Sequence, residues 1–212
     1  LAIRHFISHL QEMSLYHPEH LLGRSAEESV LLNAYFASLS GSSAAVILIR
    51  GESGLGKTKL AETLRQPCLE DDGYFVRGKF DQMSHGSANS PYSGISSAFA
   101  DYCSAVESRC QEEREEVSKK LRKEIKGDER LLFEAIPSLR RIITGGDCYP
   151  VEEEEGKLES QVEHSSHRFL YLIRRIICAI SSIGDPIVFL IDDVQWANKT
   201  EIEVLRGETE CN

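Results

Sequence analysis

The chain has 212 residues, 41% hydrophobic and 27% charged, which is enough for one sizeable core or one domain with an extension. Its formal net charge of −10 argues against a broad basic surface for nucleic acid. No stretch approaches the length of a membrane span, and the six cysteines show no C-x-x-C spacing. We therefore expect a cytoplasmic (intracellular) globular protein with reduced cysteines and with no membrane or nucleic-acid partner for this segment.

The first part of the chain is predicted to be helical. Residues 1–20 should form a helical extension, because their apolar side chains recur at near-helical spacing. A second helix is predicted after Leu21-Leu22-Gly23-Arg24. Taken alone, this tetrapeptide is compatible with a loop that leads into a capped helix, with Ser25 as the N-cap and Glu28 completing a capping box.

The strongest motif is a glycine-rich loop between a predicted strand and a predicted helix. An apolar run at 44–50 predicts a buried parallel strand, and helix formers predict a helix over 58–66 that stops at Pro67. The loop between them reads G-E-S-G-L-G-K-T, which matches the phosphate-binding pattern G-x-x-x-x-G-K-[ST]. The residues predicted to contact a nucleotide here are Gly51, Glu52, Ser53, Gly54, Leu55, Gly56, Lys57, Thr58 and Lys59.

Each part of this loop has a chemical reason. Glycines let successive N–H groups point at phosphate oxygens at little steric cost, and the N-terminus of the following helix favours the same anions. Lys57 brings a positive charge to the β- and γ-phosphates, and the Thr58 hydroxyl can bind Mg²⁺. The competing interpretation is an ordinary glycine-rich turn, but such a turn requires neither a strand before it nor a helix after it.

The middle of the chain is predicted to be mainly helical. A short strand at 74–77 leads into Gly78-Lys79-Phe80-Asp81-Gln82, where Lys79 and Asp81 fit a site-facing position and a solvated loop equally well. Neither is assigned to catalysis. Apolar spacing then predicts a helix from Ser93 that continues through an acidic run to Gly127. A short helix over 128–136 and a long one over 160–183 are predicted to follow.

A second motif for a nucleotide site lies near the end of the chain. Five apolar residues at 187–191 predict a buried strand that ends in Asp192 and Asp193. The carboxyl end of a parallel strand lies at the ligand crevice, beside the phosphate loop. Asp192 is therefore predicted to hold Mg²⁺ through water and Asp193 to polarise the attacking water, so Asp193 and Lys57 form the predicted catalytic set.

The distance along the chain between the two motifs is larger than a simple fold needs. Lys57 and Asp192 are 135 positions apart (192 − 57). Two strand–helix steps need only about 60 residues. The surplus predicts a helical insertion within about 100–160.

Together these motifs resemble AAA+ ATPases of the origin-recognition-like and signal-transduction (STAND) branch. The resemblance is carried by L-L-G-R-S-A-E at 21–27, the loop at 51–58 (Walker A), G-K-F-D-Q at 78–82 and I-D-D-V-Q-W-A at 191–197 (Walker B). In those families the first element lies against the adenine and the ribose, which implies Gly23, Arg24 and Glu27 as further nucleotide-binding residues. The resemblance also implies a three-layer α/β/α P-loop sandwich with a mostly parallel sheet over residues 21–212.

The resemblance further implies an activity. Members of this branch bind ATP with Mg²⁺, often hydrolyse it slowly and act as nucleotide-dependent switches in signalling. The expected ligands are ATP, ADP and Mg²⁺, and the expected partners are other domains of a longer parent chain and further copies of this chain. The sensor strand, the helical lid and the arginine finger would lie beyond this segment, so the domain is expected to be incomplete at its C-terminus.

Three other functions compete with the switch. One is a nucleotide-binding module without useful turnover, because Asp193 is one methylene shorter than the Glu of many vigorous AAA+ motors. Another is a replication initiator that engages DNA through domains outside this segment. A P-loop small-molecule kinase is the third, but that class needs neither the Gly-Arg element nor D-D-V-Q-W.

Overall fold

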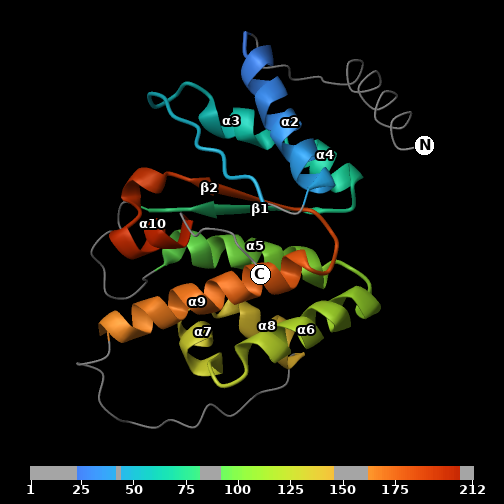
Figure 1. Cartoon of the computed structure of the whole chain (residues 1–212), viewed down its shortest axis with the longest axis vertical. Coiled ribbons are helices and arrows are strands. Elements are labelled where there is room, and N and C mark those ends of the chain that lie inside the picture. The colour runs from blue at the N-terminus through green and yellow to red at the C-terminus, as the bar shows by residue number, and fades with distance from the viewer. Residues whose placement is uncertain (1–22, 42–43, 82–91, 146–161, 206–212) are drawn as a thin grey trace.

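The computed structural model describes residues 23–41, 44–81, 92–145 and 162–205. Two strands form a small sheet with helices on both sides: α2, α3 and α4 lie on one side, and α5 to α9 lie on the other (Figure 1). No helix in the described ranges combines the length and the apolar character needed to cross a membrane.

Helices make up most of the described secondary structure. The strands are β1 (Tyr74–Lys79) and β2 (Ile187–Asp192). The helices are α2 (Ser25–Ser40), α3 (Lys57–Glu62), α4 (Arg65–Glu70), α5 (Ser93–Glu107), α6 (Gln111–Ile125), α7 (Glu129–Ala135), α8 (Ser138–Thr144), α9 (Val162–Ser181), the 3₁₀ helix η2 (Val194–Trp196) and α10 (Lys199–Leu205).

The sheet brings the ends of its two strands together. β1 and β2 run parallel, with Tyr74 opposite Ile187 and Lys79 opposite Asp192. Parallel neighbours cannot be joined by a tight hairpin, and the helices α5 to α9 make the crossover between them. This register places Lys79 and Asp192 side by side at the carboxyl edge of the sheet.

The predicted strand over 44–50 is wrong. These residues have no regular secondary structure and lie outside the sheet, and the side chains of Val46 and Leu48 expose 74% and 63% of their surface. An apolar run becomes a buried strand only when other strands and helices cover it. Of this run, Ile49 packs against the small cluster below α2. The described sheet therefore has two strands, and the three-layer sandwich stays a prediction.

Two predicted helices are each divided in the structure. The helix predicted over 58–66 becomes α3 and α4, and α4 continues through Pro67 because the missing N–H falls in the first turn, where it has no acceptor within the helix. The helix predicted from Ser93 to Gly127 breaks between Glu107 and Gln111. A single helix of that length would extend roughly 50 Å in one direction. In the structure α5 packs on β1, whereas α6 packs on α8 and α9, so the chain turns between them.

Most of the other helices agree with their predictions. The predicted spans over 128–136 and 160–183 correspond to α7 and α9, whereas α8 was not predicted. The N-terminus of α2 differs from the prediction by one residue, because Arg24 rather than Ser25 is the N-cap residue. The predicted extension over 1–20 lies outside the described residues, and the division of the chain into extension, core and insertion stays a prediction.

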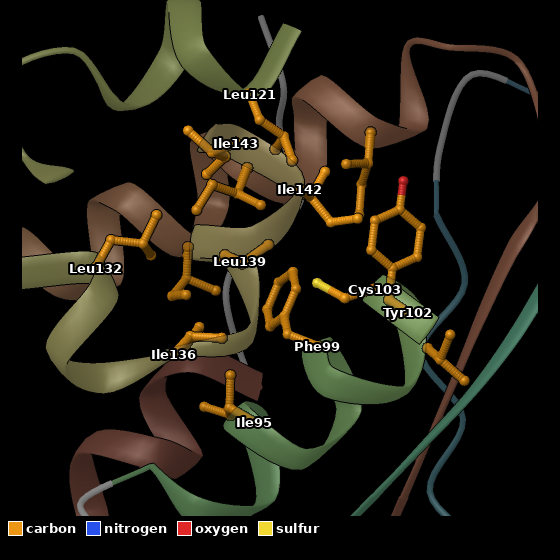
Figure 2. Packing of buried hydrophobic residues seen from close by; sticks show 14 of the residues in the cluster. Ile95, Phe99, Tyr102, Cys103, Leu121, Leu132, Ile136, Leu139, Ile142 and Ile143 are labelled. Carbon is orange, nitrogen blue, oxygen red and sulfur yellow. The ribbon is translucent and has the colours of Figure 1, made fainter. Parts of the chain in front are cut away.

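The main core lies between the sheet and the helical layer. Figure 2 shows labelled side chains of α5, α6, α7 and α8, together with Ile136 between the last two helices, converging on one another, and α9 contributes a further apolar face. The labelled core residues are Ile95, Phe99, Tyr102, Cys103, Leu121, Leu132, Ile136, Leu139, Ile142 and Ile143. A smaller cluster holds α2 against α3, α4 and β1; its buried members are Leu31, Tyr35, Leu60, Leu64, Cys68 and Phe75.

The cysteines depart from expectation at one position. Cys68 and Cys103 are buried free thiols and Cys110 is an exposed one. Cys178 is disulfide-bonded, so the expectation of reduced cysteines is wrong there. The absence of C-x-x-C spacing excludes only local pairing, because a disulfide needs nearness in space rather than in sequence.

Candidate nucleotide-binding site

The glycine-rich loop has the backbone that its sequence pattern predicts. Gly54 and Gly56 have φ angles of +81° and +74°, in the left-handed region that glycine enters without a steric penalty. Gly56 directly precedes α3. Gly51 is different, because an added Cβ there would lie in ordinary contact, 3.5 Å from Leu55 Cδ1. Backbone conformation therefore requires glycine at the two later positions.

Two cations contact the carbonyl groups of this loop. Lys57 Nζ donates a hydrogen bond to the Glu52 carbonyl oxygen at 2.8 Å. Arg24 Nη2 donates to the Leu55 carbonyl oxygen at 2.7 Å, from the N-terminal end of α2. Residues 51–55 are exposed and 56–58 are half-buried, so the outer part of the loop is open to a ligand.

The first of the two strand-end aspartates lies directly beside the loop. The Thr58 hydroxyl donates to Asp192 Oδ2 at 2.8 Å, although the residues are 134 positions apart. The other oxygen, Oδ1, accepts from the Asp193 backbone N–H at 2.9 Å. A hydroxyl and a carboxylate are the hard oxygen ligands that Mg²⁺ prefers. These two side chains therefore fit a shared Mg²⁺, whose charge would offset that of nucleotide phosphates.

The second aspartate is held by donors on both of its oxygens. Gln195 Nε2 donates to Asp193 Oδ1 at 2.9 Å, and the Lys79 ammonium lies 3.2 Å from Oδ2. The hydrogen bond from Gln195 and the contact with Lys79 hold the pKa of Asp193 below its usual range. Its φ of +55° is unusual for a residue with a side chain, which indicates that the surrounding contacts impose this conformation.

Close packing between β1 and α5 sets the position of Lys79. A Cβ added at Gly78 would lie 2.2 Å from the Gly94 carbonyl oxygen, so glycine permits this approach. The Lys79 backbone N–H then donates to Ser97 Oγ at 3.1 Å. From the sequence alone, Lys79 fits a site-facing position and a solvated loop equally well. The signal that places it there is the strand register opposite Asp192, which appears only when β1 and β2 pair.

The predicted site residues form two groups: those at the end of β2 with Thr58, and those of the glycine-rich loop and the start of α2. Thr58, Asp192 and Asp193 lie together, and the charge of Lys57 is close enough to contribute to the lowered pKa of Asp193. The other predicted residues are the loop residues Gly51, Glu52, Ser53, Gly54, Leu55, Gly56 and Lys59 and, at the start of α2, Gly23, Arg24 and Glu27. In the α2 group, Arg24 contacts the loop, whereas Glu27 is exposed in the first helical turn.

These features define a class of protein. A loop that bends at two positive-φ glycines, a lysine and a threonine at the start of a helix, and an aspartate at the end of a parallel strand are the parts of a P-loop nucleotide site. The model of the family described as AAA ATPase domain matches residues 20–207. The chain belongs to this family, whose members have a P-loop α/β fold and bind ATP, usually with Mg²⁺. No match is found among curated proteins or among solved structures.

Proposed function

We propose that this chain is the ATP-binding, slowly hydrolysing core of a regulatory AAA ATPase that acts as a nucleotide-dependent switch in signalling. The observation that carries the proposal is the 2.8 Å hydrogen bond between Thr58 and Asp192. It joins the phosphate loop to the end of β2, so one bound nucleotide would contact two segments that are distant in sequence.

Each side chain has a role in this proposal. Residues 51–59 surround the phosphates, with Lys57 as the cation on the β- and γ-phosphates. Thr58 and Asp192 hold Mg²⁺, and Asp193 polarises the attacking water. Gly23, Arg24 and Glu27 border the nucleotide on the side of α2.

The state of Asp193 supports slow rather than fast turnover. A carboxylate acts as a base through its free lone pairs, and its strength as a base falls with its pKa. Gln195 and Lys79 engage both oxygens of Asp193 and lower its pKa. The same observation favours the second candidate, a nucleotide-binding module without useful turnover.

The contacts of α9 support the switch. This helix precedes β2, whose end carries Asp192, and it is joined to α6 by charged groups. Arg175 Nη2 lies 3.1 Å from Glu124 Oε2, and Lys120 of α6 donates to the Ser182 carbonyl oxygen at 2.8 Å just after α9. A shift of β2 on nucleotide binding would therefore reach the helical layer. Further domains of a parent chain, or further copies of this chain, are the proposed receivers.

The test is a calorimetric titration with ATP and with ADP in Mg²⁺. We expect binding by the unmodified chain and a loss of at least about tenfold in affinity for Lys57→Ala and for Asp192→Ala. Lys119→Ala is the matched control, because Lys119 is an exposed lysine on α6, outside the site. It should bind as the unmodified chain does.

A phosphate-release assay separates the two candidates. Slow release that disappears in Asp193→Asn would support the switch, whereas binding without release would support the module without turnover. If a sample that unfolds cooperatively in urea binds neither nucleotide, both candidates are overturned.

A further inference from the structure

We propose that Arg24 acts on nucleotide binding by orienting the phosphate loop, and not by contacting the base or the ribose. This inference rests on the proposed nucleotide-binding function and assigns a positioning role within it. Its starting point is the hydrogen bond from Arg24 Nη2 to the Leu55 carbonyl oxygen, 2.7 Å long, between residues 31 positions apart.

The hydrogen bond from Arg24 also fixes the direction of a neighbouring N–H group. The Leu55 carbonyl and the Gly56 N–H belong to the same peptide unit, and in a planar trans peptide these two groups point in opposite directions. No cis peptide is present in the described residues. By holding the carbonyl oxygen, Arg24 therefore turns the Gly56 N–H toward the opposite side, away from α2.

This peptide unit needs an external anchor because its surroundings are permissive. Rotation of this unit changes the ψ angle of Leu55 and the φ angle of Gly56. Gly56 has a φ of +74°, and glycine populates positive and negative φ about equally. The unit between Leu55 and Gly56 can therefore turn over at little cost when nothing holds it. The hydrogen bond from Arg24 selects one of its two orientations.

The other carbonyl contact of the loop cannot serve the same purpose when nucleotide is bound. Lys57 Nζ lies on the Glu52 carbonyl oxygen, but the proposed role of Lys57 requires its ammonium to move to the phosphates. Arg24 is not assigned to the phosphates, so its guanidinium need not leave the Leu55 carbonyl oxygen when nucleotide binds. Its bond to Leu55 is the one that can persist while phosphate is bound.

The backbone of Arg24 is fixed at the start of α2. It is the N-cap residue of α2, and its carbonyl oxygen accepts from the Glu28 N–H at 3.0 Å. The same helix is anchored by Leu31 and Tyr35, which are 4% and 5% exposed and pack in the cluster that includes Leu60 of α3. The helix that follows the loop, α3, and the helix that Arg24 caps, α2, thus share one small core.

The experiment compares ATP with inorganic tripolyphosphate, which has the phosphates but neither base nor ribose. Affinities are measured by calorimetry in Mg²⁺ for the unmodified chain, Arg24→Ala and Arg24→Lys, with Lys119→Ala as the control for the loss of one positive charge. We expect Arg24→Ala to weaken both ligands by the same factor, about tenfold. Arg24→Lys keeps the charge and a donor, so its loss should be smaller and again equal for both ligands.

A second measurement follows the loop directly. In ¹H–¹⁵N spectra of the nucleotide-free protein, Arg24→Ala should shift and broaden the Gly56 amide signal and leave Gly41, at the far end of α2, unchanged. Urea unfolding of the variant at an unchanged midpoint shows that the fold is retained, because the Arg24–Leu55 bond is exposed.

The possible results divide clearly. If Arg24→Ala weakens ATP but leaves tripolyphosphate binding unchanged, Arg24 contacts the base or ribose and the inference is overturned. If Arg24→Ala changes neither the ATP affinity nor the tripolyphosphate affinity and leaves the Gly56 signal unchanged, the loop does not need Arg24. That result also overturns the inference. If the unmodified chain binds neither ligand, the proposed nucleotide site fails, and the inference that rests on it fails too.

Discussion

The Lys79 ammonium lies 3.2 Å from Oδ2 of Asp193, at the carboxyl edge of the two parallel strands. The side chain of Lys79 is 69% exposed and that of Asp193 34%, so this ion pair contributes below about 1 kcal/mol to stability. Its effect on chemistry is larger than its effect on folding, since it helps to keep the pKa of Asp193 low. Lys79 therefore bears on how readily Asp193 can accept a proton.

We predict that Lys79→Ala increases the rate of phosphate release by about two- to fivefold, because a carboxylate with a higher pKa is a stronger base. Lys79→Arg keeps the positive charge and should release phosphate at nearly the original rate. The assay is single-turnover hydrolysis at saturating ATP. A slower rate in Lys79→Ala with unchanged ATP affinity would contradict the prediction and would make Lys79 a residue that positions Asp193.

The hydroxyl of Thr58 should matter only when Mg²⁺ is present. We predict that Thr58→Ala binds ATP about tenfold more weakly in Mg²⁺, because the metal loses one oxygen ligand and Asp192 loses its donor. Thr58→Ser keeps the hydroxyl and should retain most of the affinity. Titrations in Mg²⁺ and in EDTA provide the comparison. An equal loss under both conditions would show that Thr58 supports the loop rather than the metal.

A substitution at Phe99 tests the packing between the helical layer and the sheet. Its side chain is 1% exposed, and its ring lies 5.9 Å from that of Phe189 on β2. We predict that Phe99→Ala lowers the free energy of unfolding by about 3–5 kcal/mol, because it leaves a cavity in the core. Leu69→Ala is the control, since Leu69 is 50% exposed and should change stability by less than about 0.5 kcal/mol. Urea unfolding followed by circular dichroism measures both, and equal values for the two variants would contradict the described core.

The three free thiols among the described residues should differ sharply in reactivity. Burial raises the pKa of the Cys68 thiol to about 11 and that of Cys103 to about 12, whereas Cys110 is exposed. The thiolate is the reactive form, so at about pH 8 iodoacetamide should label Cys110 and leave the other two unlabelled until urea unfolds the chain. The labelling rate of Cys68 should rise only as the pH approaches its raised pKa. Peptide mapping by mass spectrometry locates the labels, and early labelling of Cys103 would show that α5 is not packed as described.

Some of the fold could be read from local patterns. The strands at β1 and β2 and the helices α7 and α9 correspond to predicted segments, because their apolar spacing is determined within a few residues of each position. The expected strand over 44–50 shows the limit of this reasoning. An apolar run indicates that burial is favourable, but pairing and covering by distant segments decide whether burial occurs. Val46 and Leu48 remain exposed in the described structure.

The break between α5 and α6 has the same explanation. The apolar spacing between Ser93 and Gly127 is compatible with one helix. The break between Glu107 and Gln111 follows from tertiary packing rather than from a strong local signal in the sequence. α5 packs on β1, whereas α6 packs on α8 and α9, so the chain must turn between them. The sequence thus predicts which residues of the two helices are buried, but not that the two helices point in different directions.

The sequence by itself determined the chemistry available at the site: a loop whose glycines permit positive φ, a lysine, a threonine hydroxyl and a strand that ends in two carboxylates. These are properties of adjacent residues, and spacing along the chain is enough to recognise them. Tertiary structure alone decided what those groups touch. Arg24 reaches Leu55, Thr58 reaches Asp192 and Lys79 reaches Asp193. These contacts depend on how α2, α3 and the two strands pack, because short-range bonds between distant residues form only after the core has fixed the elements that carry them.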